Sequence, residues 1–250
     1  MIQIEALTLE LLMRLRKGER VVLYGRRGAG KSTVVAALRE RLEREGIPCG
    51  HCAGTAHLDD ITQALQRAYP TVDVTSIQRR AARSRLWLAA DQKQGVLLLD
   101  HITQLNNAMV GFLRRLVGGI AGVMLVLDVD TPRERSKMRV GRLGGIPLQL
   151  PPFPPAEMRS LWLEERTRRG LPILDLRTER HLIHAAQGRP GWIVRCAALA
   201  ERDHYWREGK LALINLLCSD TEIAVRYGAQ ALAELQSRAP ATAGSALSIQ

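Results

Sequence analysis

Aromatic residues are scarce in this 250-residue chain, cysteines are few, and long apolar runs are missing. Phe, Trp and Tyr together make up 4% of the residues, so aliphatic side chains must fill the core. Four cysteines in a chain of this length do not suggest the disulfide framework of a small secreted domain. Because no apolar run approaches the ~18 residues of a membrane helix and Met1–Glu5 has no signal-peptide pattern, we expect a soluble, cytoplasmic protein without membrane contacts.

Lysine is also scarce, although the chain is strongly basic. Lys and Arg number 36 against 25 Asp and Glu, which gives a formal charge of +11 and a pI near 10.2. Lysine nevertheless occurs only at positions 17, 31, 93, 137 and 210. A basic balance of this size favours a polyanionic partner, above all nucleic acid. The alternative is that frequent arginine raises the pI without creating a basic patch.

Lys31 lies in a phosphate-binding pattern. Residues 25–32 read Gly-Arg-Arg-Gly-Ala-Gly-Lys-Ser and fit G-x-x-x-x-G-K-[ST] at every fixed position. The apolar run at 21–24 predicts a buried strand before the motif, and residues 33–40 predict a helix after it. In that context backbone N–H groups and the helix dipole hold phosphates, Lys31 reaches the β- and γ-phosphates, and the Ser32 hydroxyl binds Mg²⁺. The predicted nucleotide-binding residues are Gly25, Arg26, Arg27, Gly28, Ala29, Gly30, Lys31, Ser32 and Thr33.

A second pattern supplies an acidic partner for this loop. Residues 95–101 read Gly-Val-Leu-Leu-Leu-Asp-His, an apolar run that ends in Asp100. Such a run predicts a strand that is buried on both faces of a parallel sheet, with its acid at the carboxyl end. Since it comes 68 residues after Ser32, beyond the helix that begins at the loop and two more predicted helices, Asp100 fits the acid that holds Mg²⁺ opposite Ser32.

Residues 49–52 form a C-x-x-C pair with a histidine inside it, which is compatible with a metal site or a redox site. No second pair follows at zinc spacing, and the segment falls where the second strand is predicted. We therefore interpret Cys49, His51 and Cys52 as positions of a buried strand.

The remaining chain predicts a core followed by a helical region. Predicted strands lie at 21–25, 48–54, 95–100, 123–129 and 146–150, with predicted helices at 5–17, 31–45, 59–69, 76–92 and 105–117. A proline-rich stretch at 151–155 predicts a hinge. Beyond it, helices are predicted at 155–169, 176–187, 190–203, 207–217 and 219–237. We predict a core domain at 1–150, a helical lid with C-terminal helices at 151–237 and a disordered tail at 238–250.

This order of motifs resembles the AAA+ ATPases, and within them the Orc/Cdc6-like, ExeA-like and TniB/TnsC-like bacterial branch. The related STAND switch ATPases share many of the same features. The resemblance covers residues 15 to about 205. It implies an α/β fold: a P-loop NTPase three-layer sandwich whose parallel five-stranded sheet has the order 5-1-4-3-2, followed by a C-terminal α-helical lid.

The resemblance also implies roles for individual residues. Lys31 and Ser32 correspond to the Walker A pair and Asp100 to the Walker B acid, with ATP and Mg²⁺ as ligands. Asp128 or Asp130 occupies the sensor 1 place at the end of the fourth strand. Arginine fingers precede the fifth strand in this family, and the candidates here are Arg139 and Arg142, with Arg133 and Arg135 behind them.

Three departures from the family pattern concern hydrolysis. His101 follows the Walker B acid where the family usually has the glutamate that polarises water. Gly191 ends a Gly188-Arg189-Pro190-Gly191 segment whose last place is the sensor 2 arginine in the family, and Arg189 and Arg195 are candidate substitutes. The third departure is at sensor 1, where Asp128 or Asp130 would place an acid. The predicted catalytic residues are thus Lys31, Asp100, His101 and Asp128, in a site that binds ATP·Mg²⁺ and hydrolyses it slowly.

Two functions follow from these patterns. The first is a DNA-associated AAA+ ATPase that assembles with ATP into a homo-oligomer and recruits a protein partner in transposition or replication. The candidate DNA contacts are Arg79, Arg80, Arg83, Arg133, Arg135 and Lys137. The alternative is a STAND-like regulatory switch that acts through protein partners without nucleic acid.

Overall fold

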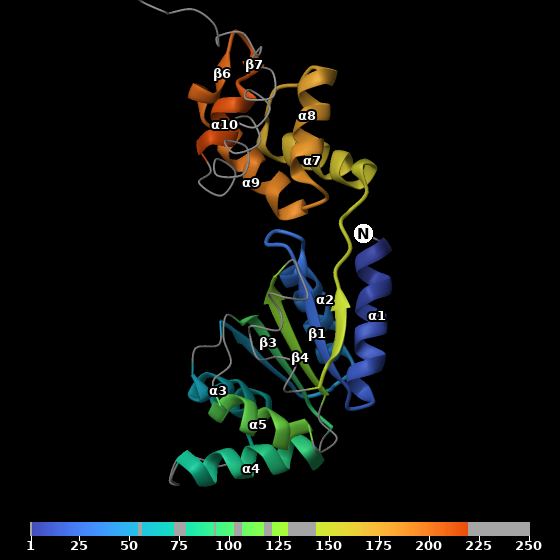
Figure 1. The fold of residues 1–250 in the computed structure, drawn as a ribbon, viewed down its shortest axis with the longest axis vertical. Helices are drawn as coiled ribbons and strands as arrows, with labels where there is room; N and C mark the ends of the chain where they lie inside the picture. Colours follow the sequence, from blue (N-terminus) through green and yellow to red (C-terminus); the bar gives the residue numbers. More distant parts are fainter. Residues whose placement is uncertain are drawn as a thin grey trace, which may run out of the picture. The chain divides into compact units, whose positions relative to one another are not determined.

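The computed structural model describes residues 2–54, 57–72, 79–92, 94–102, 107–117, 122–129 and 144–219. The chain divides into two compact units (Figure 1). The first holds Met1–Phe153 together with Arg189–Gly191, and the second holds Pro154–Gly188 and Trp192–Gln250. The domain boundary that we predict at residue 150 stays a prediction, and the predicted tail at 238–250 lies outside the described residues.

A five-stranded parallel sheet is the framework of the first unit. Its order is β2-β3-β4-β1-β5, which confirms the predicted order. The elements are α1 (Ile2–Arg16), β1 (Arg20–Gly25), α2 (Lys31–Arg44), β2 (Cys49–Ala53), α3 (Leu58–Ala68), α4 (Arg79–Gln92), β3 (Val96–Ile102), α5 (Asn107–Val117), β4 (Gly122–Asp128) and β5 (Ile146–Gln149).

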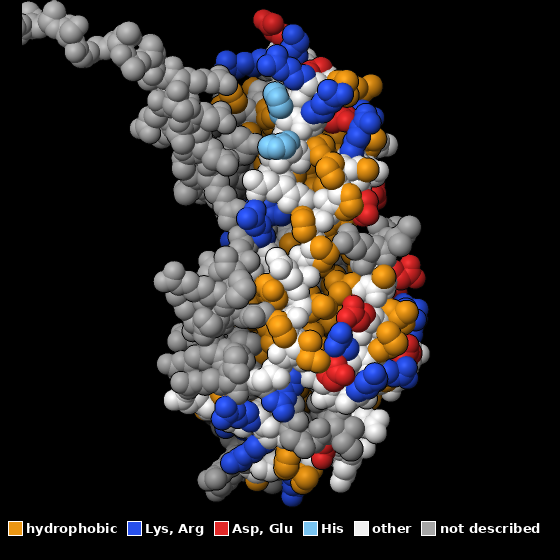
Figure 2. Space-filling view, turned by 45° about the vertical axis from the view of Figure 1, so that its right-hand side comes forward, with side chains coloured by type: hydrophobic (Ala, Val, Ile, Leu, Met, Phe, Trp, Pro, Cys, Tyr) orange, Lys and Arg blue, Asp and Glu red, His pale blue; other side chains and the backbone are white. Residues whose placement is uncertain are grey.

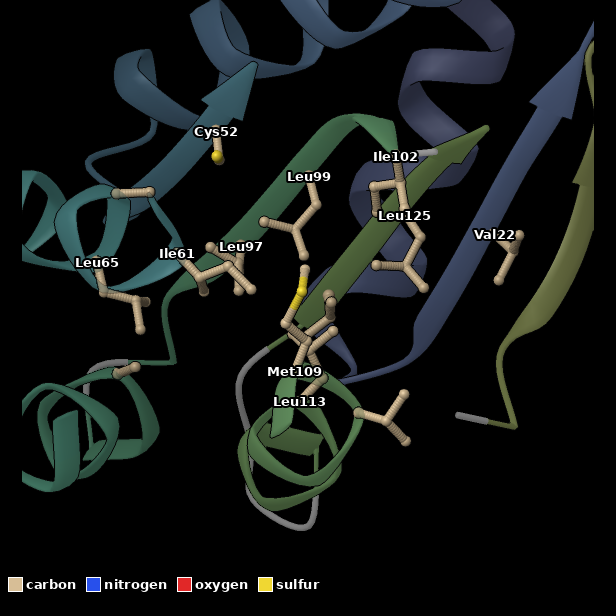
Figure 3. Close-up of a cluster of buried hydrophobic side chains, with 14 of the residues drawn as sticks. Val22, Cys52, Ile61, Leu65, Leu97, Leu99, Ile102, Met109, Leu113 and Leu125 are labelled. Atoms are coloured by element: carbon tan, nitrogen blue, oxygen red, sulfur yellow. The ribbon is translucent and has the colours of Figure 1, made fainter. Parts of the chain in front are cut away.

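Alternating side chains of the sheet pack against helices on both of its faces. Val21 and Leu23 of β1 join a cluster with α1 and α2, whereas Val22 and Tyr24 join the cluster formed with α3, α4 and α5. Figure 3 shows the second cluster, with helical side chains such as Ile61 directed at the strands. Each such side chain contributes about 1.5–3 kcal/mol when fully buried. These two clusters produce the three-layer sandwich.

The strand register aligns the carboxyl ends of the central strands. β1 pairs with β4 so that Gly25 lies beside Asp128. β3 pairs with β4 up to Leu99, and the register then shifts before Ile102. The irregularity contains Asp100 and His101, so the predicted loop and both predicted acids meet at one edge of the sheet.

The cysteine pair at 49–52 belongs to the sheet, as the strand interpretation predicts. Cys49 packs in the α1–α2 cluster and Cys52 in the opposite cluster, so the two thiols point to different faces. Burial raises the pKa of the Cys49 thiol to about 12, which removes the thiolate needed for redox chemistry or metal binding. Among the described residues, no group of three His, Cys, Asp or Glu could hold a metal ion.

The second unit is mainly helical. It contains α7 (Pro155–Arg169), α8 (Leu176–Ala186) and most of α9 (Pro190–Ala200), followed by η2 (Asp203–Tyr205), β6 (Trp206–Arg207), β7 (Lys210–Leu211) and α10 (Leu213–Ser219). The limits of α7 agree with the prediction. Pro155 begins the helix at a position that needs no N–H donor. Gly170 ends it with a left-handed backbone, at φ 64°. Asp175 caps α8 by accepting hydrogen bonds from the N–H groups of Arg177 and Thr178.

The predicted helix at 207–217 is wrong over residues 207–212 and right over 213–217. β6 and β7 form an antiparallel hairpin there, and α10 begins only at Leu213. Glu208 and Gly209 both have left-handed backbones, at φ 50° and 73°, which is the geometry of a two-residue hairpin turn. The predicted helix at 219–237 begins at the last residue of α10 and otherwise lies outside the described residues.

None of the helices in the described part of the chain is long and apolar enough to cross a membrane.

Candidate functional site

The glycine-rich turn at 26–30 connects the carboxyl end of β1 to α2. Gly28 and Gly30 have φ angles of 79° and 96°, a left-handed conformation that side chains rarely allow. Gly30 is the N-cap of α2, and as a glycine it places no side chain over the first N–H groups of the helix. The turn therefore presents backbone donors and the positive end of a helix dipole, which is the arrangement that binds phosphate.

Lys31 is held at this turn by three acceptors. Its ammonium is buried, and Nζ donates to the carbonyl oxygens of Gly25 and Arg26, each at 2.8 Å. Nζ also lies 2.7 Å from Oδ1 of Asp128 in an ion pair. An ammonium has three N–H donors, so these three partners satisfy it fully.

His101 links Asp128 to the two predicted magnesium ligands. Its Nδ1 lies 3.3 Å from Oδ2 of Asp128, and its Nε2 lies 3.5 Å from Oγ of Ser32. The backbone N–H of His101 donates to Oδ1 of Asp100 at 2.8 Å, and the Asp100 side chain is 5% exposed. The His101 backbone is left-handed, at φ 51°, where β3 changes register. The irregular strand end thus turns the imidazole toward the loop.

Asp128 is negatively charged at neutral pH. Burial raises the pKa of its carboxyl, but hydrogen bonds and charge from Lys31, with a further contribution from His101, bring the pKa below its usual value. The site consequently holds the Asp128 carboxylate against the buried Lys31 ammonium, and His101 connects Asp128 to Asp100.

The segment 189–191 belongs to the first unit and contacts the glycine-rich turn. The N–H of Gly191 donates to the carbonyl oxygen of Gly28 at 2.9 Å. A Cβ added at Gly191 would lie 3.1 Å from the Cα and from the carbonyl oxygen of Gly28. Pro190 and Phe153 lie against Gly30 on the same side of the turn. Gly191, in the predicted sensor 2 place, thus contributes a backbone hydrogen bond and no charge.

Residues 2–149 match a family described as the AAA ATPase domain, and this match covers more than half of the chain. The chain belongs to this family. The AAA ATPase domain therefore comprises the sheet, the glycine-rich turn and the strand ends described above.

Solved structures with the same fold include Orc1, Cdc6p and DnaA proteins. Orc1 of Aeropyrum pernix, solved in complex with DNA, is 18% identical with a TM-score of 0.55, and the match covers 88% of this chain and 65% of that one. Cdc6p of Pyrobaculum aerophilum is 15% identical, with a TM-score of 0.53 and coverage of 84% and 63%. DnaA of Aquifex aeolicus, bound to AMPPCP, is 16% identical, with a TM-score of 0.51 and coverage of 79% and 60%.

These likenesses confirm the predicted resemblance to the Orc/Cdc6-like branch at the level of the fold. This chain spans less than two thirds of each of the three solved chains. Among curated proteins, the ABC transporter atnG of Emericella nidulans is 37% identical over 97 residues, which is 39% of this chain and 5% of that protein.

Within the AAA ATPase domain, the predicted catalytic residues Lys31, Asp100, His101 and Asp128 come together with Ser32. The turn residues Arg26 and Arg27 are exposed beside them. The pairing of Lys31 with Asp128 was not predicted. The acid after the β4 run was the available signal, but only the strand register shows that it lies beside Gly25.

The remaining predicted charged site residues differ in how far the structure describes them. Asp130, Arg133, Arg135, Lys137, Arg139 and Arg142 lie outside the described residues. For Arg79 and Arg80 the structure describes only the backbone, in α4. Arg83 forms an ion pair with Asp59 of α3 at 2.7 Å, and Arg195 is an exposed residue of α9 in the second unit.

Proposed function

We propose that this AAA ATPase domain binds ATP·Mg²⁺ and hydrolyses it slowly. The observation that carries the proposal is the cluster of Lys31, Ser32 and Asp100 at the end of β1 and β3, beside a turn that presents backbone donors. Two left-handed glycines give that turn its shape. The residue cluster and the turn are both parts of the site at which phosphate and its cation bind in P-loop proteins.

The residues present fit the magnesium ion that this family implies. The Ser32 hydroxyl and the buried Asp100 carboxylate are oxygen donors of the kind that Mg²⁺ prefers. His101 connects them, since its imidazole approaches Ser32 while its N–H binds Asp100. When bound, the ion would neutralise phosphate charge and orient the triphosphate. The turn and Lys31 would hold the phosphates.

Slow hydrolysis is supported by what surrounds the proposed γ-phosphate position. The resemblance puts a water-polarising glutamate after the Walker B acid, but His101 stands there and its Nδ1 faces Asp128. Gly191 replaces the lid arginine and contributes a backbone N–H to Gly28. Neither change removes a group that binds ATP, whereas both alter groups that act on the γ-phosphate.

The test is nucleotide binding and turnover of the full chain. Lys31→Ala should abolish binding of a fluorescent ATP analogue, whereas Lys17→Ala, which changes an exposed lysine at the end of α1, should leave binding intact. Turnover of the native chain should be slow. A native rate typical of competent ATPases that falls in His101→Glu would refute the proposal of slow hydrolysis.

We also propose that the ATP-bound protein assembles on DNA and recruits a protein partner, with Arg139 or Arg142 acting as fingers on a neighbouring subunit. The support is the charge of +11, the basic residues at 133–142 and the fold shared with an Orc1 that was solved with DNA. The assay is salt-dependent retention of labelled duplex by the ATP-loaded chain. Replacing Arg133, Arg135 and Lys137 by alanine should weaken retention and reduce its dependence on salt. Replacing Arg41 and Arg44, which form ion pairs on α2, should not.

A regulatory switch without nucleic acid is the second candidate. On the face shown in Figure 2, Lys and Arg side chains lie among Asp and Glu side chains rather than forming one basic surface. Arg83 is paired with Asp59, so one candidate DNA contact already has an acidic partner. Size-exclusion chromatography with an ATP analogue, with and without DNA, separates the two: assembly that needs only nucleotide favours the switch.

A further inference from the structure

Every donor of the Lys31 ammonium has a partner within the protein. Two are backbone carbonyls of the turn, Gly25 and Arg26, and the third is the carboxylate of Asp128. A phosphate that binds Lys31 must therefore share or displace one of these acceptors. Asp128 is the only one of the three with a full negative charge, so it is the acceptor that most resembles a phosphate oxygen.

The position of Asp128 is fixed by the fold. Its backbone is paired with Gly25 in the β1–β4 register, and its second carboxylate oxygen faces Nδ1 of His101. Both oxygens thus have partners, on Lys31 and on His101. Two contacts, one on each oxygen, therefore hold the carboxylate beside Lys31.

Asp128 contacts the side chain that reaches the outer phosphates in P-loop proteins. The turn at 26–30 and the start of α2 provide the donors for the inner phosphates, whereas Lys31 reaches outward to the β- and γ-phosphates. Asp128 contacts Lys31 directly, and His101 lies between Asp128 and Ser32. The terminal phosphate of a triphosphate, which Lys31 reaches in P-loop proteins, would therefore meet the Lys31–Asp128 pair.

We infer that Asp128 is a specificity-determining residue that makes this site favour a nucleoside diphosphate over the corresponding triphosphate. Its carboxylate holds Lys31 in the place of a γ-phosphate oxygen and repels the third phosphate. The inference rests on the proposed nucleotide site and names what that site selects. A neighbouring charge changes the equilibrium constant for binding a charged group by about 10- to 1,000-fold. Because the Asp128 side chain is 35% exposed, the lower end of that range applies.

The experiment is equilibrium binding of fluorescent ADP and of a non-hydrolysable fluorescent ATP analogue to the full chain, both with Mg²⁺. Asp128→Asn keeps the shape of the side chain and an oxygen for Lys31 but removes the charge. We expect the triphosphate to bind about tenfold more tightly and the diphosphate to change by less than about threefold. Glu40→Gln, which removes an exposed carboxylate from α2, should change neither affinity.

Two further variants keep the test decisive. Asp128→Ser removes the charge and the bulk, and it should shift the ratio of affinities in the same direction if Asp128→Asn does not fold. An unchanged ratio in the folded variant, or weaker triphosphate binding, would overturn the inference while leaving the nucleotide site intact. If the native chain binds neither nucleotide, or Lys31→Ala binds as well as the native chain, the proposed nucleotide site itself fails.

Discussion

Gly191→Ala tests whether the contact between segment 189–191 and the glycine-rich turn is an integral part of the AAA ATPase domain. Gly191 is the second residue of α9, after Pro190. Helix propensity alone would make alanine the better residue there, by up to about 1 kcal/mol. The structure predicts the opposite sign, because the added Cβ would lie 3.1 Å from backbone atoms of Gly28.

The magnitude follows from two losses. Backbone atoms of Gly28 cannot move as the end of a flexible side chain can, so the crowding costs about 1–3 kcal/mol. The hydrogen bond from Gly191 to Gly28, 2.9 Å long, contributes about 0.5–1.5 kcal/mol and would lengthen or break. After subtracting about 1 kcal/mol for helix propensity, we expect a net destabilisation of about 0.5–3.5 kcal/mol. In a chain of this size each kcal/mol lowers Tm by about 2–4 °C.

The assay is thermal unfolding of the full chain, with nucleotide binding as a second readout. Gly111→Ala is the matched control, since Gly111 lies in α5 and a Cβ there meets nothing within 4 Å. The control should stabilise the protein by about 0.5–1 kcal/mol, so the same Gly→Ala substitution should have opposite effects on stability at the two positions. Gly191→Ala with a Tm equal to or above that of the native chain would refute the reasoning.

Two further predictions concern stability. Leu98→Ala, at a fully buried position of β3, should destabilise the protein by about 2–5 kcal/mol, whereas Leu88→Ala, at a half-exposed position of α4, should cost far less in the same denaturant titration. Asp128 pairs with Lys31 and His101, which lower its pKa, so its contribution to stability should be present above about pH 4 and disappear as the pH falls through the lowered pKa. The stability difference between the native chain and Asp128→Asn, measured from neutral to acid pH, should shrink over that window, and a pH-independent difference would contradict the pairing.

The core of the fold was predictable because the apolar runs are strong signals. Residues 21–24, 95–99 and 123–127 consist of consecutive apolar residues or nearly so, which is typical of strands buried on both faces. Their burial in β1, β3 and β4 is complete or nearly so. The strand order was implied by the resemblance rather than by these runs, since periodicity does not tell which strands pair.

The hairpin in the second unit could not be found in the same way. Its strands, Trp206–Arg207 and Lys210–Leu211, have two residues each, too few to show an alternating pattern. Glu208-Gly209 is a weaker turn signal than Asn-Gly or Asp-Gly, because a glutamate is rarely left-handed. The apolar residues that follow suit a helix, so the predicted helix extended back through the turn.

At the site, motifs located the residues but did not predict their contacts. The prediction treated His101 and Asp128 as two separate departures from the family pattern. In the structure they face each other, with Nδ1 and Oδ2 3.3 Å apart. Three-dimensional pairing of this kind depends on the β3 irregularity and on the β1–β4 register, which no local pattern in the sequence encodes.

The contact between His101 and Asp128 means that the two departures depend on each other. A glutamate at position 101 would bring a third carboxylate next to Asp100 and Asp128, and Lys31 is the one ammonium that the described residues place among them. Like charges at this spacing raise the pKa of at least one group, which weakens it as a polarising base. We therefore expect His101→Glu alone to raise ATP turnover less than His101→Glu combined with Asp128→Asn. Steady-state turnover of the native chain, the two single variants and the double variant forms a complete cycle, and strictly additive effects in that cycle would show that the two residues are not coupled.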